Sequence, residues 1–169
     1  LDWGVPIPVD GWDNKRMYVW FEAVIGYLSA AVEYNAIHGD PEGWHNWWHR
    51  NGARAYYFIG KDNIPFHAII WPGELIGVGE TLDELLGSQT QGKLALPYDV
   101  PANEFMNMEG KKISGSRNWG VWGLDFLTRY DPDPLRYYLT VNMPESKDSD
   151  WDWGDFLRRN NDELVATWG

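Results

Sequence analysis

The chain has 169 residues, of which 14 are Lys or Arg and 25 are Asp or Glu, so its formal charge at pH 7 is −11. The length fits one domain or parts of two, and 44% hydrophobic residues can build a core, which excludes a disordered chain. The absence of Cys excludes a disulfide-stapled module, a catalytic thiol and a zinc site of Cys ligands. The acidic balance excludes nucleic-acid binding through a generally basic surface.

The first part of the chain predicts an irregular segment, a strand and two helices. Residues 1–14 are rich in Gly, Pro and Asp and predict irregular structure. The β-branched and aromatic run 17–21 predicts a buried strand. A helix is expected over 22–37, with Gly39 near its end, and a short helix over 44–50.

The pattern of strand and helix is then repeated. A strand is expected over 53–59 and a helix over 64–76, with Pro65 in its first turn, where a missing N–H costs nothing. Strands that alternate with helices are typical of an α/β fold with a parallel sheet. Residues 79–96 are polar and rich in Gly, and they predict a loop.

The remainder of the chain predicts an extended segment followed by helices. Residues 101–108 are expected to be extended and to turn at Glu109 and Gly110. Helices are then expected over 124–130, 135–141 and 153–168. Asp133 is the expected N-cap of the second of these helices, with Pro134 at its first position. Acidic residues precede the last helix, which favours a helix N-terminus there.

The sharpest motif is the segment 60–67, Gly-Lys-Asp-Asn-Ile-Pro-Phe-His, at a strand-to-helix transition. Open α/β sheets bind ligands at this edge. Gly60 allows close approach of a ligand to the backbone, and Asp62 suits a ligand ammonium or hydroxyl group. The spacing of Asn63, His67 and Trp71 places them on one helix face. A capped structural turn with an inward-facing His is the alternative interpretation.

A second strand-to-helix transition carries Trp20, Ala23 and Tyr27. These residues can wall an apolar pocket, because Ala23 leaves room between two large rings. Ordinary packing of a strand against a helix would produce the same pattern.

Residues 110–118 contain the one compact basic patch of this acidic sequence, formed by Lys111, Lys112 and Arg117 among Gly and Ser. Basic residues and small hydroxyls in such a stretch suit a loop that closes over phosphates. A solvated turn is the alternative.

Taken together, these segments resemble the methionyl-tRNA synthetases, a family of class I aminoacyl-tRNA synthetases. The matching segments are 1–6, 18–27, 60–67 with Trp71 and Pro72, 112–116, 133–138 and 155–161. The resemblance implies an α/β fold: the C-terminal half of a Rossmann-type catalytic domain over 1–110. A KMSKS-like loop and stem-contact region over 111–150 and the first helix of an α-helical anticodon-binding domain over 151–169 are implied to follow.

The implied activity is that of a cytoplasmic methionine–tRNA ligase. Methionine and ATP, accompanied by Mg²⁺, would give methionyl-adenylate, and the methionyl group would then pass to tRNA(Met); no membrane or DNA partner is implied. The N-terminal HIGH-type motif and a zinc-binding knuckle have no counterpart here. The chain is therefore expected to be an inactive fragment with no metal site of its own, and zinc could be bound only in the missing part. A class I synthetase for another apolar amino acid and a non-enzymatic, aromatic-rich binding module remain alternatives.

The resemblance also implies a methionine pocket, formed by Trp20, Ala23, Tyr27, Asn63, Phe66, His67 and Trp71. Asp62 would hold the methionine ammonium group, and Gly60 would lie near the adenylate. Aromatic walls suit a flexible thioether, at about 0.3–1.5 kcal/mol per sulfur–ring contact. A polar group near the sulfur, from Tyr27 or His67, would sharpen selection.

In the loop, Lys112, Ser114 and Ser116 match the family's KMSKS motif, which stabilises charge on the ATP phosphates. Gly115 stands where the motif has its second Lys. That phosphate contact is therefore missing or replaced by a backbone N–H, unless Lys111 or Lys112 compensates.

Overall fold

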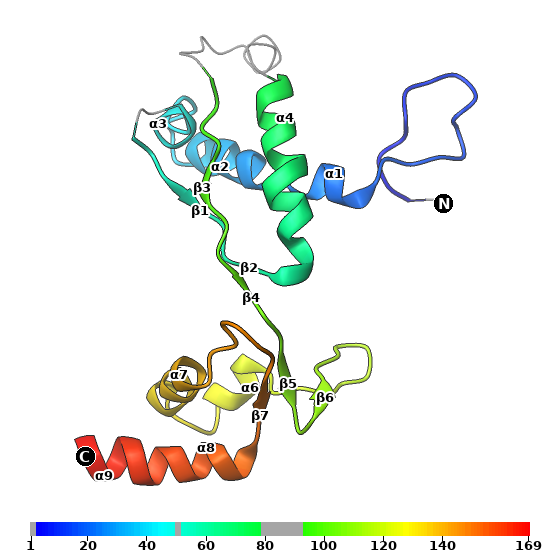
Figure 1. Cartoon of the computed structure of the whole chain (residues 1–169). Helices are drawn as coiled ribbons and strands as arrows, with labels where there is room; N and C mark the ends of the chain where they lie inside the picture. The colour runs from blue at the N-terminus through cyan, green and yellow to red at the C-terminus, as the bar shows by residue number, and fades with distance from the viewer. Residues whose placement is uncertain (1–2, 50–51, 79–92) are drawn as a thin grey trace. The chain divides into compact units, whose positions relative to one another are not determined.

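The computed structural model describes residues 3–49, 52–78 and 93–169 (Figure 1). The chain divides into two compact units, Leu1–Pro101 and Ala102–Gly169. Most of the loop predicted over 79–96 lies outside the described residues. In the described part of the chain, no helix is both long enough and apolar enough to cross a bilayer.

Unit 1 is mainly helical. Its helices and helical turns are α1 (Val19–Ala23), α2 (Gly26–Ile37), α3 (His45–Trp48), η1 (Lys61–Asn63), η2 (Phe66–Ile70) and α4 (Trp71–Val78). Helix α2 confirms the main part of the helix predicted over 22–37, and Gly39 follows it with φ +79°, a conformation that favours glycine. The helix predicted over 64–76 is also confirmed, although its second turn, η2, is π-helical.

The buried strand predicted over 17–21 is wrong. Helix α1 occupies most of this segment, and the Tyr18, Val19 and Phe21 side chains are exposed. A short apolar run lacks the periodicity that separates a strand from a helix, so β-branched and aromatic content alone favoured the strand.

The strands of unit 1 are short: β1 (Ala55–Tyr56), β2 (Ile59–Gly60) and β3 (Pro97–Asp99). Strands β1 and β3 pair in parallel, and the Tyr57 N–H continues the ladder by donating to the Asp99 carbonyl at 3.0 Å. The predicted strand over 53–59 is thus present as two pieces, and the parallel pairing fits the expected α/β class.

The core of unit 1 lies between α2, α3, α4 and the strands. Its buried apolar side chains are Val24, Leu28, Trp44, Trp48, Tyr57, Ile59, Trp71, Leu75 and Leu94. Trp48 packs edge-on against Trp71, with ring centroids 5.7 Å apart. Large rings rather than aliphatic side chains therefore fix α3 against α4.

Unit 2 combines a small sheet with helices. Its elements are β4 (Ala102–Asn103), β5 (Met106–Met108), β6 (Lys111–Lys112), α6 (Gly123–Leu127), α7 (Pro132–Val141), β7 (Ser149–Trp151), α8 (Trp153–Arg159), η3 (Asn160–Val165) and α9 (Ala166–Trp168). Strand β5 is central, parallel to β7 and antiparallel to β6. The turn predicted at Glu109 and Gly110 is confirmed, with φ of 50° and 72°. The Asp150 carboxylate accepts the Gly110 N–H at 2.9 Å and so fixes this turn.

The core of unit 2 is an aromatic cluster of Phe126, Tyr138, Trp151 and Phe156, each less than 9% exposed. The Tyr138 and Trp151 centroids are 4.9 Å apart, and those of Trp151 and Phe156 are 5.2 Å apart. Together with the edge-on contact of Phe126 with Trp151 at 6.2 Å, these contacts join α6, α7, β7 and α8.

An aspartate occupies the N-cap position of both α7 and α8. The N-cap of helix α7 is Asp131, and Pro132 is its first residue. The predicted N-cap, Asp133, is therefore wrong by two residues. Two Asp-Pro pairs in succession both fit a helix start, and the first of them is used. The helix predicted over 153–168 is confirmed, and its N-cap Asp152 accepts the Asp155 N–H at 2.7 Å.

A charge network connects α7 to the C-terminal helix. The Asp155 carboxylate accepts hydrogen bonds from Arg158 at 2.6 Å and Arg159 at 2.8 Å, and Glu163 accepts the Tyr137 hydroxyl at 2.9 Å. The hydrogen bonds from Arg159 and Arg158 lower the pKa of Asp155, and the hydrogen bond from Tyr137 lowers the pKa of Glu163.

This network predicts that the C-terminal helix loosens in acid. The pKa of each carboxyl is lower in the folded chain than in the unfolded chain, where the values are about 3.9 for Asp and 4.3 for Glu. Its stabilisation is therefore present above about pH 4 and is lost as the pH falls through the folded pKa values. Hydrogen exchange of the amides over 153–168, corrected for intrinsic rates, should show reduced protection at pH 3, and Asp155→Asn should reduce this pH dependence. Asp133→Asn is the control because its ion pair with Arg136 is largely exposed and screened by solvent. Equal acid sensitivity in Asp155→Asn and the parent would contradict the prediction.

Candidate functional site

Four rings from separate elements meet in unit 1, and we call Tyr27, Tyr57, His67 and Trp71 the ring cluster. Trp71 is 1% exposed, and its indole N–H donates to the Tyr57 hydroxyl at 2.9 Å. The Tyr27 ring lies edge-on to Tyr57, with centroids 5.0 Å apart. Burial raises the pKa of the Tyr57 hydroxyl. A buried phenol that stays neutral and accepts the indole N–H fixes the Trp71 ring.

His67 is the polar centre of the ring cluster, and it is only 3% exposed. Its Nδ1 lies 2.9 Å from the Asn63 carbonyl oxygen, and its Nε2 lies 2.8 Å from the Tyr27 hydroxyl. Because a carbonyl oxygen can only accept, Nδ1 carries a proton, and in the neutral ring Nε2 accepts from Tyr27. Asn63 and His67, predicted to share one helix face, are thus in contact, but through the Asn63 backbone carbonyl and not its side chain.

Trp20 and Phe66 form a second aromatic contact. Their rings are stacked with centroids 4.3 Å apart and an interplanar angle of 9°. Phe66 directly precedes His67, so the stacked pair and the ring cluster both involve the first residues of η2. Ala23, at the end of α1, is exposed.

Gly60 and Asp62 lie just before these rings in the chain. Gly60 ends β2 in an extended conformation, and Asp62 lies in the single turn of η1. The Asp62 carboxylate is exposed and has no hydrogen bond or ion pair to another described residue. It is therefore available to a positively charged ligand group.

The predicted loop residues belong to unit 2, and we call residues 110–119 the basic loop. Backbone hydrogen bonds in both directions, of 2.8 and 2.9 Å, join Ser114 to Trp119 and close the loop. The hydroxyl oxygens of Ser114 and Ser116 lie 3.2 Å apart. Lys112 is exposed on β6, with its ammonium nitrogen 5.3 Å from the centroid of the Phe105 ring.

Tyr57 was missed by the sequence reasoning. It holds Trp71 and contacts Tyr27, yet only His67, Tyr27 and Trp71 were chosen from this cluster. The alternation of Tyr57 with Ile59 in the predicted strand was the available signal, since both side chains point inward and are buried.

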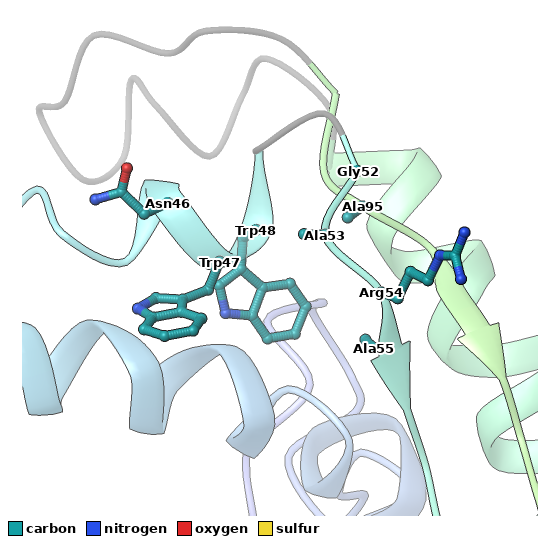
Figure 2. A pocket seen from close by; sticks show the side chains of 8 residues that line it. All are labelled: Asn46, Trp47, Trp48, Gly52, Ala53, Arg54, Ala55 and Ala95. Carbon is teal, nitrogen blue, oxygen red and sulfur yellow. The ribbon is translucent and has the colours of Figure 1, made fainter.

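Two cavities of unit 1 are lined mainly by residues that were not predicted to bind substrate. One, of about 500 Å³, is lined by Asn46, Trp47, Trp48, Gly52, Ala53, Arg54, Ala55 and Ala95, and the Arg54 side chain extends away from the two indoles (Figure 2). The other, of about 740 Å³, is apolar and lies along α2 and α4, and burial raises the pKa of Glu74 in its wall. Of the residues predicted to bind substrate, Trp71 alone lines either cavity.

Comparisons with known proteins match the whole chain. The family model described as tRNA synthetases class I (M) matches residues 1–169. The methionine–tRNA ligase of Thermomicrobium roseum is 58% identical over 169 residues, which are 100% of this chain and 27% of that protein. The methionine–tRNA ligase of Roseiflexus castenholzii is 56% identical over 176 residues, which cover 100% of this chain and 28% of that protein. The chain therefore spans little more than a quarter of the length of these curated relatives.

Solved structures of methionyl-tRNA synthetases also match nearly the whole chain. The Mycobacterium tuberculosis methionyl-tRNA synthetase bound by methionyl-adenylate matches with a TM-score of 0.64 and 26% identity, over 98% of this chain and 28% of that one. A second structure of the Mycobacterium tuberculosis enzyme, in complex with methionyl-adenylate, gives a TM-score of 0.65 and 28% identity, again over 98% of this chain and 28% of that one.

Proposed function

The chain belongs to the class I methionyl-tRNA synthetase family, and from this premise we propose that it supplies the methionine pocket and an ATP-phosphate loop of a methionine–tRNA ligase. The observation that carries this proposal is the hydrogen-bonded series from Tyr27 through His67 to Asn63, which is fixed in a cluster of rings. It combines apolar walls with one oriented polar edge, as a thioether side chain requires. In the experiments below, "the complete ligase" is a methionine–tRNA ligase that carries this chain's sequence.

The proposed reaction has two steps. In the first, a carboxylate oxygen of methionine attacks the α-phosphorus of ATP, which arrives with Mg²⁺. An O–P bond forms, the bond to the β-phosphate oxygen breaks, and pyrophosphate leaves with that electron pair. In the second, a hydroxyl of the terminal adenosine of tRNA(Met) attacks the methionyl carbonyl and loses its proton, and AMP leaves.

The rings are proposed to select methionine by shape and by polarisability. A sulfur–ring contact contributes about 0.3–1.5 kcal/mol, and stacked Trp20 and Phe66 together with Trp71 offer several such contacts. One methylene changes binding in an apolar pocket by only about 1–3 kcal/mol. A fixed Tyr27–His67 pair adds polar discrimination against amino acids that lack the sulfur, and exposed Ala23 leaves space beside Trp20.

Asp62 is proposed to bind the methionine ammonium group. Its carboxylate is exposed and has no partner among the described residues, and the next residue, Asn63, holds His67. The ammonium group of methionine would thus bind Asp62, and its side chain would contact His67, which is held by the neighbouring residue Asn63. Gly60, with no side chain, allows the adenylate to approach the end of β2.

Lys112, Ser114 and Ser116 are proposed to bind the phosphates of ATP. The two hydroxyls lie 3.2 Å apart in the closed basic loop and can donate together to one phosphate, and Lys112 adds a positive charge. This loop stabilises the charge that develops as pyrophosphate leaves. The N–H of Gly115 lies between the two hydroxyls in sequence.

The proposed function is tested by exchange of labelled pyrophosphate into ATP in the complete ligase. Exchange should require methionine, and leucine and isoleucine should support it at least about 100-fold less well, because apolar discrimination and a polar contact act together. Methionine-independent exchange, or equal exchange with leucine, would reject methionine as the substrate.

Tyr27→Phe should raise the KM for methionine about 10-fold. The change keeps the ring but leaves His67 Nε2 without its partner, and an unsatisfied buried polar atom costs about 1–3 kcal/mol. Steady-state exchange kinetics would measure KM and kcat separately. Tyr34→Phe is the control, since Tyr34 is an exposed tyrosine of the same helix. An unchanged KM in Tyr27→Phe would mean that the hydroxyl has no part in methionine binding.

A further inference from the structure

The basic loop carries two cations that the proposed function leaves unused, Lys111 and Arg117. Lys111, Lys112 and Arg117, together with Trp119, line a single cavity of about 460 Å³. The whole chain has a net charge of −11, yet three of its 14 cations fall within this loop. A cavity lined in this way attracts a multiply charged anion rather than a neutral group.

The turn of the loop fixes the position of Arg117. The Asn118 N–H donates to the Gly115 carbonyl at 3.0 Å, and the Ser114–Trp119 hydrogen bonds close the turn on either side. Asn118 itself adopts φ +49°. Arg117 is therefore a central residue of a closed turn, and its backbone is held in place before any ligand binds.

The three cations differ in their surroundings. The ammonium nitrogen of Lys111 lies 5.2 Å from the centroid of the Trp119 ring, and that of Lys112 lies 5.3 Å from the Phe105 ring. The Arg117 guanidinium has no hydrogen bond or ion pair to another described residue, although it lines the same cavity. Arg117 is also the only one of these three residues with a planar guanidinium group. A guanidinium can donate two parallel hydrogen bonds to a phosphate, whereas an ammonium acts as a point charge.

We propose that Arg117 binds the pyrophosphate leaving group and replaces the charge that position 115 lacks. This inference rests on the proposed function. As the bond between the α-phosphorus and the bridging oxygen breaks, negative charge grows on the departing pyrophosphate, and Arg117 stabilises it by hydrogen bonding. The loop can therefore function with Gly at position 115, because its second basic contact comes from Arg117, two positions further along the turn.

The test moves the charge between the two positions in the complete ligase. Arg117→Gln should lower kcat for pyrophosphate exchange by about 100- to 1,000-fold, the usual loss for one donor to a developing anion, with a smaller change in KM for ATP. Arg117→Lys should keep an intermediate rate. Gly115→Lys alone is the reference for the double variant and should fold normally, because a Cβ at Gly115 meets no atom within 4 Å. The double variant Gly115→Lys/Arg117→Gln should recover most of the rate lost in Arg117→Gln.

Controls separate this inference from the function on which it rests. Lys15→Gln removes an exposed cation of unit 1 and should leave exchange unchanged. A parent enzyme without methionine-dependent exchange would reject the proposed function itself. An active parent in which Arg117→Gln exchanges within threefold of normal, or in which the double variant is no faster than Arg117→Gln, would overturn the role of Arg117 alone.

Discussion

Asp62→Ala is expected to lower methionine-dependent pyrophosphate exchange in the complete ligase by at least about 100-fold. Truncating one partner of a hydrogen-bonded charge pair costs about 2–5 kcal/mol, because the other charge is left without its partner. The structure supports a role in ligand binding rather than in folding, since the Asp62 carboxylate is exposed and has no hydrogen bond or ion pair to another described residue.

Asp62→Asn sharpens this test because it keeps the size and loses the charge. It should be almost as defective as Asp62→Ala if the ligand group is an ammonium, whereas a neutral ligand group would be bound nearly as well by Asn. Asp10→Ala is the matched control, since Asp10 is an exposed aspartate of the same unit and no site residue. Near-normal exchange in Asp62→Ala would remove Asp62 from the binding site.

Trp71→Ala should destabilise unit 1 by about 3–5 kcal/mol, the usual cost of replacing a buried Trp or Phe by Ala. Trp71 is 1% exposed, packs against Trp48 and donates to the Tyr57 hydroxyl, which the change would leave buried without its partner. Protection of the α4 amides against hydrogen exchange should fall by at least about 100-fold, since each 1.4 kcal/mol is a factor of ten.

Two comparisons make the Trp71 prediction specific. Trp71→Phe should cost less than Trp71→Ala, because it retains most of the ring and loses mainly the N–H. Trp47→Ala should change α4 protection little, since Trp47 is 69% exposed. Unchanged protection in Trp71→Ala would mean that the ring cluster does not hold α4 in place.

Sequence reasoning predicted the helices best where a local residue marks their ends. Pro65, Gly39 and Asp152 each act within one turn of the chain, and the helices they bound are present. The run over 17–21 lacks such a marker, and its strand or helix state depends on neighbours distant in sequence. Asp131 and Asp133 both fit the start of α7, and only the packed helix selects between them.

The candidate site was predictable to the same extent. The approach of His67 to the Asn63 carbonyl follows from their separation of four residues. The contact between Tyr27 and His67 joins residues 40 positions apart, and no periodicity predicts it. Tyr57 was missed for the same reason, because its importance depends on a tertiary hydrogen bond to Trp71.

The π-helical turn at Phe66–Ile70 makes the spacing of the chain itself part of the site. The Trp71 N–H bonds to the Phe66 carbonyl, five residues back instead of four. Such a turn holds one residue more than a turn of an α-helix, because its hydrogen bonds span five residues instead of four. Deleting one residue from it would restore the α-helical hydrogen bonds and leave the orientation of Trp71 toward Tyr57 nearly unchanged. A deletion in the regular part of α4 would instead rotate all that follows by about 100°, because no such turn is there to absorb it.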